Sequence, residues 1–484
     1  MAPPVPEVRR IHDYLWEIPK SGGMRVPGRI YADEKLMQAI RGDQSLQQVA
    51  NVAHLPGIVG YSIAMPDIHW GYGFPIGGVA ATDPAAGGVV SPGGVGYDIN
   101  CGVRLATIDV PAADVQAKIQ DVVVQLFKHV PCGVGSEGAI WKLSRKEIDD
   151  LSRKGARWAL EKGLGTHADI ECTEEEGCIR GADPEVVSDR AKERGAMQVG
   201  TLGSGNHFLE IQIVEEVYLP EAADAFGVHE GGVTMLVHCG SRGYGYQVCD
   251  DYIRVMNRAM AKYGIVVPDR QLCCAPVDSD EGREYLAAMA CAANYAWANR
   301  QVILRNAEKA LMKALGVSPR DLNLRMVYDV CHNICKFETH TVNGGSKQLC
   351  IHRKGATRAA PAVDAFIPDR YRDVGQPILI PGDMGTYSFL CVGTPRALEE
   401  TWGSTCHGAG RVMSRSEAIR RGKGRSIVDE LKAKGVTIMA KGYRTIVEEM
   451  PDAYKDVADV VEVMERAGVS KKVARLRPIG VIKG

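Results

Sequence analysis

The sequence has almost no net charge and no long apolar run. Lysine and arginine total 58 residues against 59 aspartate and glutamate residues, so the formal net charge is −1. The chain therefore lacks the overall basic excess that would indicate a nucleic-acid-binding protein. Any binding of nucleic acid must depend on a local basic patch. No stretch of about 18 apolar residues occurs, which argues against a membrane-spanning helix. The first residues, MAPPVPEVRRIHDYLW, carry charges where a signal peptide needs an apolar stretch, so we expect a cytoplasmic protein without membrane contact.

Two familiar motifs are also missing. The fourteen cysteines are irregularly spaced and form no zinc-ribbon pattern, and a chain of 484 residues needs no disulfide framework. We therefore expect most of them to be small buried residues. The pattern GxxxxGK[ST] does not occur, which excludes a Walker-type nucleotide site.

The composition is that of a globular protein, 45% hydrophobic and 24% charged, with helical and strand-like segments mixed along the chain. Apolar spacing predicts helices over 113–130, 283–315 and 415–435 and strands over 208–218, 233–238 and 322–333. No tandem repeat or Gly/Ser-rich linker divides these segments. Residues able to carry chemistry are spread from position 67 to 483, so we expect loops from the whole chain to converge on one site. We predict an α+β fold of mixed sheets flanked by helices, forming a single domain over 1–484.

Several histidines share one setting, at the end of an apolar run beside glycine or a small polar residue. They are His207, His238, His332, His352 and His407. A lone buried histidine is usually a hydrogen-bonded core residue, but loops at strand ends are where proteins place binding and catalytic groups. The segment GVGYDINCGVRL adds Cys101 three residues after Asp98. Thiolate, imidazole and carboxylate are ligands of divalent transition metals, and one sulfur could bridge two ions; these residue types admit zinc or manganese.

Glycine-rich loops that also carry Arg, Lys, Ser or Thr are a second recurring pattern in the sequence. They occupy 91–96, 203–205, 240–245, 352–358, 381–388 and 407–411. Glycine lets backbone N–H groups approach a phosphate closely, and Arg or Lys neutralises its charge. One such loop usually only turns the chain, but six of them beside a candidate metal cluster favour phosphate chemistry.

Eight segments resemble the RtcB family of RNA-splicing ligases, which join 3′-phosphate to 5′-hydroxyl RNA ends. They are SPGGVGYDINCGVR, GTLGSGNHFLEIQ, HCGSRGYGYQV, YDVCHNICKFE, HRKGATRA, PGDMGTYSF, STCHGAGRVMSR and RPIGVIKG. The resemblance runs in order through nearly the whole chain. It implies a GTP- and manganese-dependent ligase that acts in tRNA splicing or RNA repair on 3′-phosphate or 2′,3′-cyclic phosphate ends.

The resemblance also implies a role for each matching residue. The metal ligands fall on Asp98, Cys101, His207, His238 and His332, with the cysteine shared by two manganese ions. His407 is the implied nucleophile, which takes GMP from GTP and passes it to the RNA 3′-phosphate before the 5′-hydroxyl displaces it. The implied GTP or GMP contacts are Asn206, Glu210, Asn333, Ser388, Tyr454 and Lys483. Candidate phosphate or RNA contacts are Arg242, Arg353, Lys354 and Arg411. For Asp67 and His69 we expect only a supporting role.

Some points stay open at the level of sequence. A two-metal phosphohydrolase, such as a cyclic phosphodiesterase for RNA ends, would use the same metal ligands but would not need His407. A non-catalytic RNA-binding scaffold would need neither the metal ligands nor His407. The family implies RNA partners, with tRNA halves as candidates, and the activating protein archease as a further one. The acidic segment over 163–182 cannot attract RNA phosphate by its charge, and we expect it to be a surface element.

Overall fold

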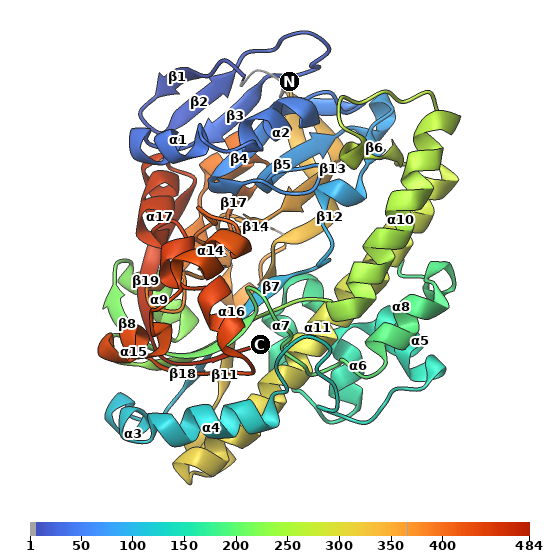
Figure 1. Ribbon diagram of the computed structural model, residues 1–484. Coiled ribbons are helices and arrows are strands. Elements are labelled where there is room, and N and C mark those ends of the chain that lie inside the picture. The colour runs from blue at the N-terminus through green and yellow to red at the C-terminus, as the bar shows by residue number, and fades with distance from the viewer. Residues whose placement is uncertain (1–5, 365) are drawn as a thin grey trace.

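The computed structural model describes residues 6–364 and 366–484, which form two large β-sheets surrounded by helices (Figure 1). The first sheet has seven strands in the order β1–β2–β3–β4–β5–β13–β12. Their bounds are β1 (Arg9–His12), β2 (Leu15–Ile18), β3 (Gly28–Tyr31), β4 (Ile58–His69), β5 (Ile76–Thr82), β12 (Asn333–Val342) and β13 (Gly345–Lys354). Neighbouring pairs are antiparallel except β3 and β4, which run parallel.

The second sheet has eight strands in the order β11–β7–β9–β8–β19–β16–β15, with β18 pairing alongside β19. Their bounds are β7 (Gly102–Ile108), β8 (Phe208–Val217), β9 (Val233–Cys239), β11 (Arg325–Cys331), β15 (Pro377–Ile380), β16 (Ser388–Gly393), β18 (Thr437–Ala440) and β19 (Ser470–Lys483). Two small pairs complete the strands: β6 (Val89–Val90) with β10 (Ala275–Pro276), and β14 (Ala356–Arg358) with β17 (Ser404–Cys406).

Helices surround both sheets, and the longest, α11, packs against α4, α5, α6 and α10. The helices are α1 (Glu34–Ile40), α2 (Ser45–Val52), α3 (Ala112–Ala117), α4 (Ile119–His129), α5 (Arg145–Lys154), α6 (Ala156–Glu161), α7 (His167–Glu171), α8 (Asp189–Gly195), α9 (Pro220–Phe226), α10 (Arg242–Lys262), α11 (Asp280–Leu315), α12 (Pro319–Leu322), α13 (Pro395–Thr401), α14 (Arg415–Arg421), α15 (Ile427–Ala433), α16 (Tyr443–Glu448) and α17 (Val457–Arg466). Within residues 6–364 and 366–484, no helix combines the length and apolar character needed to cross a membrane.

The α+β prediction is confirmed, and helices or strands lie in each predicted range, but the single helix predicted over 415–435 is two helices, α14 and α15. The helix predicted over 113–130 is divided into α3 and α4 at Lys118, whose backbone leaves the helical region. The burial of the cysteines is also confirmed, because all of them except the half-exposed Cys178 are buried.

The acidic segment over 163–182 is only partly the surface element that the sequence predicts. Its central Glu174 is 1% exposed and lies against the second sheet, where it accepts a hydrogen bond of 2.8 Å from the backbone N–H of Cys331. Lys336 and Arg358 neutralise its charge at 2.7 and 3.3 Å, and the same two cations pair with Glu175. Glu174 is therefore a buried ion-pair partner and Glu175 a partly buried one, whereas Glu176 is exposed.

One buried arginine fixes how three strand ends lie relative to one another. Arg300 of α11 donates two hydrogen bonds to Asp329 of β11, at 2.9 and 2.8 Å. It also donates to the backbone oxygens of Asn100 and Cys239, both at 2.8 Å, and to the Asn100 side chain at 2.9 Å. These bonds hold Asn100 at a φ of 52°, which asparagine tolerates better than most residues. The ends of β7, β9 and β11 are thus tied to a single guanidinium.

Replacing this guanidinium should destabilise the whole fold. We expect Arg300→Met to lower the free energy of unfolding by about 3–5 kcal/mol, because two backbone carbonyls lose a buried donor and Asp329 keeps only its pair with Arg104. Urea unfolding monitored by circular dichroism measures the change. Arg325→Met is the matched control, since its ion pair with Asp109 is exposed and should contribute about 1 kcal/mol or less. Equal midpoints for the two variants would contradict the assignment.

Candidate active site and metal centre

The sheet register brings most of the predicted site residues to one end of the second sheet, where several of its strands begin or end. Across this end Cys331 lies opposite Gly102, Gly102 opposite Cys239, His238 opposite Phe208, and Phe208 opposite Lys483. The residues at or next to these positions are Cys101, His207, His238, His332 and Lys483. Together with residues from other loops they line a cavity of about 1050 Å³.

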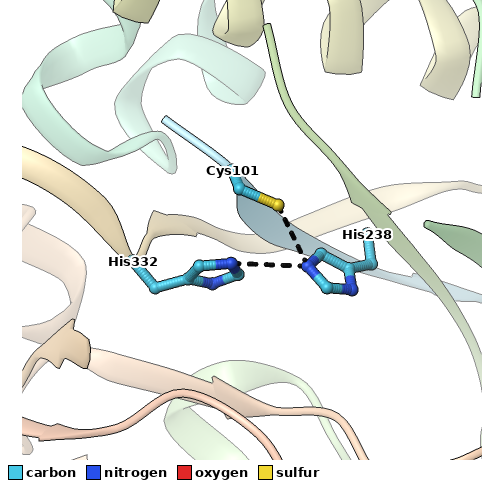
Figure 2. A group of neighbouring side chains, drawn as sticks. All are labelled: Cys101, His238 and His332. Carbon is cyan, nitrogen blue, oxygen red and sulfur yellow. Dashed lines mark hydrogen bonds between the residues drawn. The ribbon is translucent and has the colours of Figure 1, made fainter. Parts of the chain in front are cut away.

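Five predicted metal ligands form two groups that share one sulfur. Figure 2 shows Cys101, His238 and His332, with the Cys101 Sγ 3.3 Å from the His238 Nε2 and that nitrogen 3.4 Å from the His332 Nε2. The second group contains Asp98, Cys101 and His207; here the Sγ lies 3.4 Å from the His207 Nε2, which lies 2.7 Å from a carboxylate oxygen of Asp98. The thiol is the only member common to both groups.

The chemistry of these donors fits divalent transition metals. Burial holds the pKa values of His238 and His332 well below their usual range, so both rings are neutral and present lone pairs. Burial and the nearby Asp98 raise the pKa of the Cys101 thiol to about 12, so a cation is needed to keep it as a thiolate. Burial would raise the pKa of Asp98, but His207 lowers it to about 2. Thiolate, imidazole and carboxylate then make a mixed ligand set suited to zinc or manganese.

Close packing explains why glycine follows Cys239. A Cβ at Gly240 would lie 2.2 Å from a carboxylate oxygen of Asp98, so a larger residue would displace that ligand. The Ser241 backbone N–H donates to the same carboxylate at 3.0 Å. The glycine-rich loop at 240–245 therefore supports the metal ligand directly, which the sequence did not reveal.

His407, the predicted nucleophile, directly follows β17 and is oriented by Asp67 of β4. The Asp67 carboxylate accepts hydrogen bonds from the His407 Nδ1 at 2.6 Å and from its backbone N–H at 2.9 Å. Burial would raise the pKa of Asp67, but His407 and Lys455 lower it. Lys455 donates to the carbonyls on either side of Asp67, those of Pro66 at 2.8 Å and Ile68 at 2.6 Å. The imidazole is thereby fixed through its Nδ1, and among residues 6–364 and 366–484 its Nε2 has no hydrogen-bond partner; its ring lies 4.8 Å from that of His332.

The predicted nucleotide contacts surround the end of β19. Glu210 and Ser388 are each 2% exposed and joined through Gln212, which donates to them at 2.9 and 3.2 Å. Burial raises the pKa of Glu210 to about 8. Lys483 and Tyr454 line the cavity, whereas Glu210 and Ser388 lie behind its wall. Asn206 and Asn333 also line the cavity, and Asn333 donates to the backbone oxygen of Asp98 at 3.1 Å.

Three of the four predicted phosphate contacts line the cavity, namely Arg242, Lys354 and Arg411. The prediction for Arg353 does not agree with its placement. Side chains alternate along β13, so Arg353 points away from the face that carries Lys354. Its guanidinium is fully buried, pairs with Glu338 and donates to Ser404 at 2.8 Å. Burial lowers the pKa of Lys354 to about 7, and its Nζ donates to the carbonyls of Tyr72 and Phe74.

Sequence reasoning missed several residues at the cavity. Asp67 was expected only to support the site, yet it contacts the candidate nucleophile directly. Arg194 of α8, Arg415 of α14 and Arg444 of α16 also line the cavity. The PDIHWGYG segment was a signal for Asp67. Nothing in the local sequence indicates that α8, α14 and α16 each contribute an arginine to the same cavity.

An imidazole held by a buried carboxylate, beside a cluster of transition-metal ligands, is typical of metal-dependent enzymes that transfer phosphoryl groups. Comparison with known proteins narrows this class. A family model described as tRNA-splicing ligase RtcB matches residues 48–484. A tRNA-splicing ligase RtcB of Archaeoglobus fulgidus is 54% identical over 479 residues, and one of Thermococcus kodakarensis is 51% identical over 478 residues; each match covers 99% of both chains. An RNA-splicing ligase RtcB of Mycobacterium bovis is 49% identical over 439 residues, covering 90% of this chain and 100% of the relative. The chain therefore belongs to the RtcB family of tRNA-splicing ligases.

The shared sulfur gives a prediction about metal binding. We expect Cys101→Ser to weaken binding at both ligand groups by at least about tenfold, because the sulfur serves both. His207→Ala should weaken only the group with Asp98, and His332→Ala only the group with His238. Calorimetric titration of manganese into metal-free protein measures affinity and stoichiometry. Cys178→Ser, far less buried than Cys101, is the control; binding by Cys101→Ser equal to that of this control would exclude the shared ligand.

Proposed function

We propose that this protein is an RNA ligase that joins RNA 3′-phosphate or 2′,3′-cyclic phosphate ends to 5′-hydroxyl ends, using GTP. The observation that carries the proposal is the Asp67–His407 pair, because it leaves one imidazole nitrogen free at the cavity, next to the metal-ligand cluster. Membership of the RtcB family supports the same activity. tRNA halves in the cytoplasm are the proposed substrates, and archease is a proposed partner.

His407 is the proposed nucleophile. Its free Nε2 attacks the α-phosphorus of GTP, a P–N bond forms, and the bond to pyrophosphate breaks. Asp67 keeps the Nδ1 proton hydrogen-bonded throughout and stabilises the positive charge that develops on the ring. An oxygen of the RNA 3′-phosphate then attacks the phosphorus of the adduct, the P–N bond breaks, and the His407 imidazole leaves as a neutral group. The 5′-hydroxyl next attacks the activated 3′-phosphate, its proton passes to solvent, and GMP leaves. Arg242, Lys354 and Arg411, which line the cavity, are proposed to neutralise the phosphates.

We propose that Asp98, Cys101 and His207 hold one manganese ion, and Cys101, His238 and His332 a second. When bound, these ions supply positive charge that offsets the charge on the reacting phosphates. Glu210, Ser388 and Lys483 are proposed to bind the guanine, Tyr454 to lie beside it, and Asn206 and Asn333 to contact the phosphates. Glu210 lies on β8 and Lys483 on the neighbouring strand β19, and the Lys483 side chain lines the cavity.

A covalent adduct test separates ligation from the alternatives. GTP labelled on its α-phosphate should leave label on the denatured wild-type protein and none on His407→Ala. Asp67→Asn should slow labelling by about 100-fold or more, because the imidazole loses the charge that orients and stabilises it. His129→Ala, which removes a histidine remote from the cavity, should label normally.

The RNA products complete this test. Ligation of a 3′-phosphate strand to a 5′-hydroxyl strand should be lost in His407→Ala together with the label. Label-free wild-type protein, combined with intact opening of cyclic phosphate ends by His407→Ala, would instead indicate a phosphodiesterase. RNA binding without any chemistry would indicate a scaffold.

A further inference from the structure

Two cysteines are in contact on the hairpin formed by β12 and β13 (Figure 1). The register places Cys335 opposite His352 and Phe337 opposite Cys350, so the cysteines are diagonal neighbours on one face of the hairpin. Their sulfurs lie 3.0 Å apart, and both side chains are buried. Within residues 6–364 and 366–484, the structure records no other contact between two cysteine sulfurs. This contact distinguishes the pair from the cysteines that only fill the core.

A buried histidine lies beside the two sulfurs. One ring nitrogen of His352 and both sulfurs lie within 4.8 Å of one another. The Nε2 accepts a hydrogen bond of 3.2 Å from the Ser91 backbone N–H, so the proton of the neutral ring is on Nδ1. Burial lowers the pKa of His352 to about 4, which keeps the ring neutral at pH 7. No hydrogen-bond partner for this Nδ1 occurs in the described part of the chain, so its proton is free to stabilise negative charge on a sulfur.

The distance between the sulfurs favours a covalent bond over a metal ion. Two thiolates on one tetrahedral zinc ion, each about 2.3 Å from it, lie about 3.8 Å apart. The sulfurs of Cys335 and Cys350 are closer than this, and His352, with its Nε2 bound to Ser91 and its Nδ1 protonated, has no lone pair for a metal. A disulfide bond of about 2.05 Å requires the sulfurs to approach by only about 1 Å. The cluster therefore suits oxidation of the two thiols.

One of the two cysteines lines an open cavity. Cys335 belongs to the wall of a second cavity, of about 1260 Å³, which is formed by α11 and β12 together with parts of 171–181 and 366–372. Among the described residues, none lines both this cavity and the candidate active site, and Cys350 lines neither. A small oxidant that enters the second cavity therefore meets Cys335 first.

We propose that Cys335 and Cys350 are a site of reversible oxidation, at which a disulfide joins β12 to β13. Hydrogen peroxide oxidises the Cys335 thiol to a sulfenic acid, and one water is released. The Cys350 sulfur then attacks the Cys335 sulfur, the S–S bond forms, and the sulfenic hydroxyl leaves with the Cys350 proton as a second water. The two thiols together lose two electrons and two protons, and the peroxide is reduced to two waters. A small dithiol reverses the step by thiol–disulfide exchange.

The bond fastens the end of the hairpin that leads to the candidate active site. Asn333 is paired with Lys354 there, and both line that cavity. Cys335 lies two residues after Asn333 and Cys350 four residues before Lys354, so the link holds β12 and β13 together close to these side chains. Burial and the neighbouring Cys350 hold the pKa of the Cys335 thiol well above its usual range, so thiolate is scarce and the oxidation is slow. The site thus responds to prolonged rather than brief exposure to peroxide.

Peptide mapping after oxidation tests the proposal. Folded full-length protein is treated with hydrogen peroxide for several hours, its remaining thiols are blocked with N-ethylmaleimide in urea, and it is digested with trypsin without reductant. We expect peptides 326–336 and 348–353 to be joined, with a mass two hydrogens below their sum, and to separate in dithiothreitol. Circular dichroism of the treated protein before the urea step shows that the link forms in the folded state.

Serine variants locate the link within the first peptide, which also contains Cys331. Cys331→Ser is the matched control and should keep the link, whereas Cys335→Ser and Cys350→Ser should lower its yield at least about tenfold. Recovery of Cys335 and Cys350 as maleimide adducts from treated wild type, with the more exposed Cys178 oxidised in the same sample, would overturn the proposal. A link from Cys331 would also overturn it, as would zinc that protects both thiols and is lost in Cys335→Ser. These measurements involve neither GTP nor RNA, so their result does not depend on the proposed ligase function.

Discussion

The site depends on the buried ion pair between Arg300 and Asp329. The three candidate ligands Cys101, His238 and His332 come from three strands whose ends would be free to move if only sheet hydrogen bonds held them. Arg300 donates to the backbone oxygens of Asn100 and Cys239, next to Cys101 and His238, and to the side chain of Asp329, on the strand that leads to His332. A rigid planar donor with several N–H groups suits this task, and lysine could not replace it. A metal-binding cluster gains affinity when its ligands are held in place before the ion arrives.

Asp98, Asp67 and Glu210 are three buried carboxyl groups at or behind the cavity wall, and their partners determine how burial changes their pKa values. Asp98 has its pKa lowered to about 2 by His207, and Asp67 has its pKa lowered by His407 and Lys455, so both are ionised. Glu210 lacks a partner of equal strength, and burial raises its pKa to about 8. Two of these three buried carboxyl groups are thus ionised, and the third carries a proton near neutral pH. The anions orient imidazoles, while the third carboxyl is suited to a hydrogen-bonding ligand.

Local sequence was enough for most elements and for the candidate ligands, because apolar spacing and glycine-flanked histidines are local signals. The α+β class, α11 and the strands at the site follow from it. The sequence could not predict contacts between residues that are far apart along the chain. The burial of Glu174 depends on Lys336 and Arg358, more than 150 residues away, and the role of Asp67 depends on contact with a residue 340 positions later. The direction of Arg353 depends on the register of β13, which no motif encodes.

The position of β19 in the second sheet has a consequence for how the molecule forms. This strand follows all the others of its sheet in sequence, yet it lies between β8 and β16 and supplies Lys483 to the cavity. Before it inserts, β8 has an open edge and the sheet is divided into two parts. Pairing of segments so distant in sequence requires costly loop closure and is slow compared with helix formation. Completion of the cavity is therefore a late folding event, and during synthesis the open edge of β8 is a surface that a chaperone could protect.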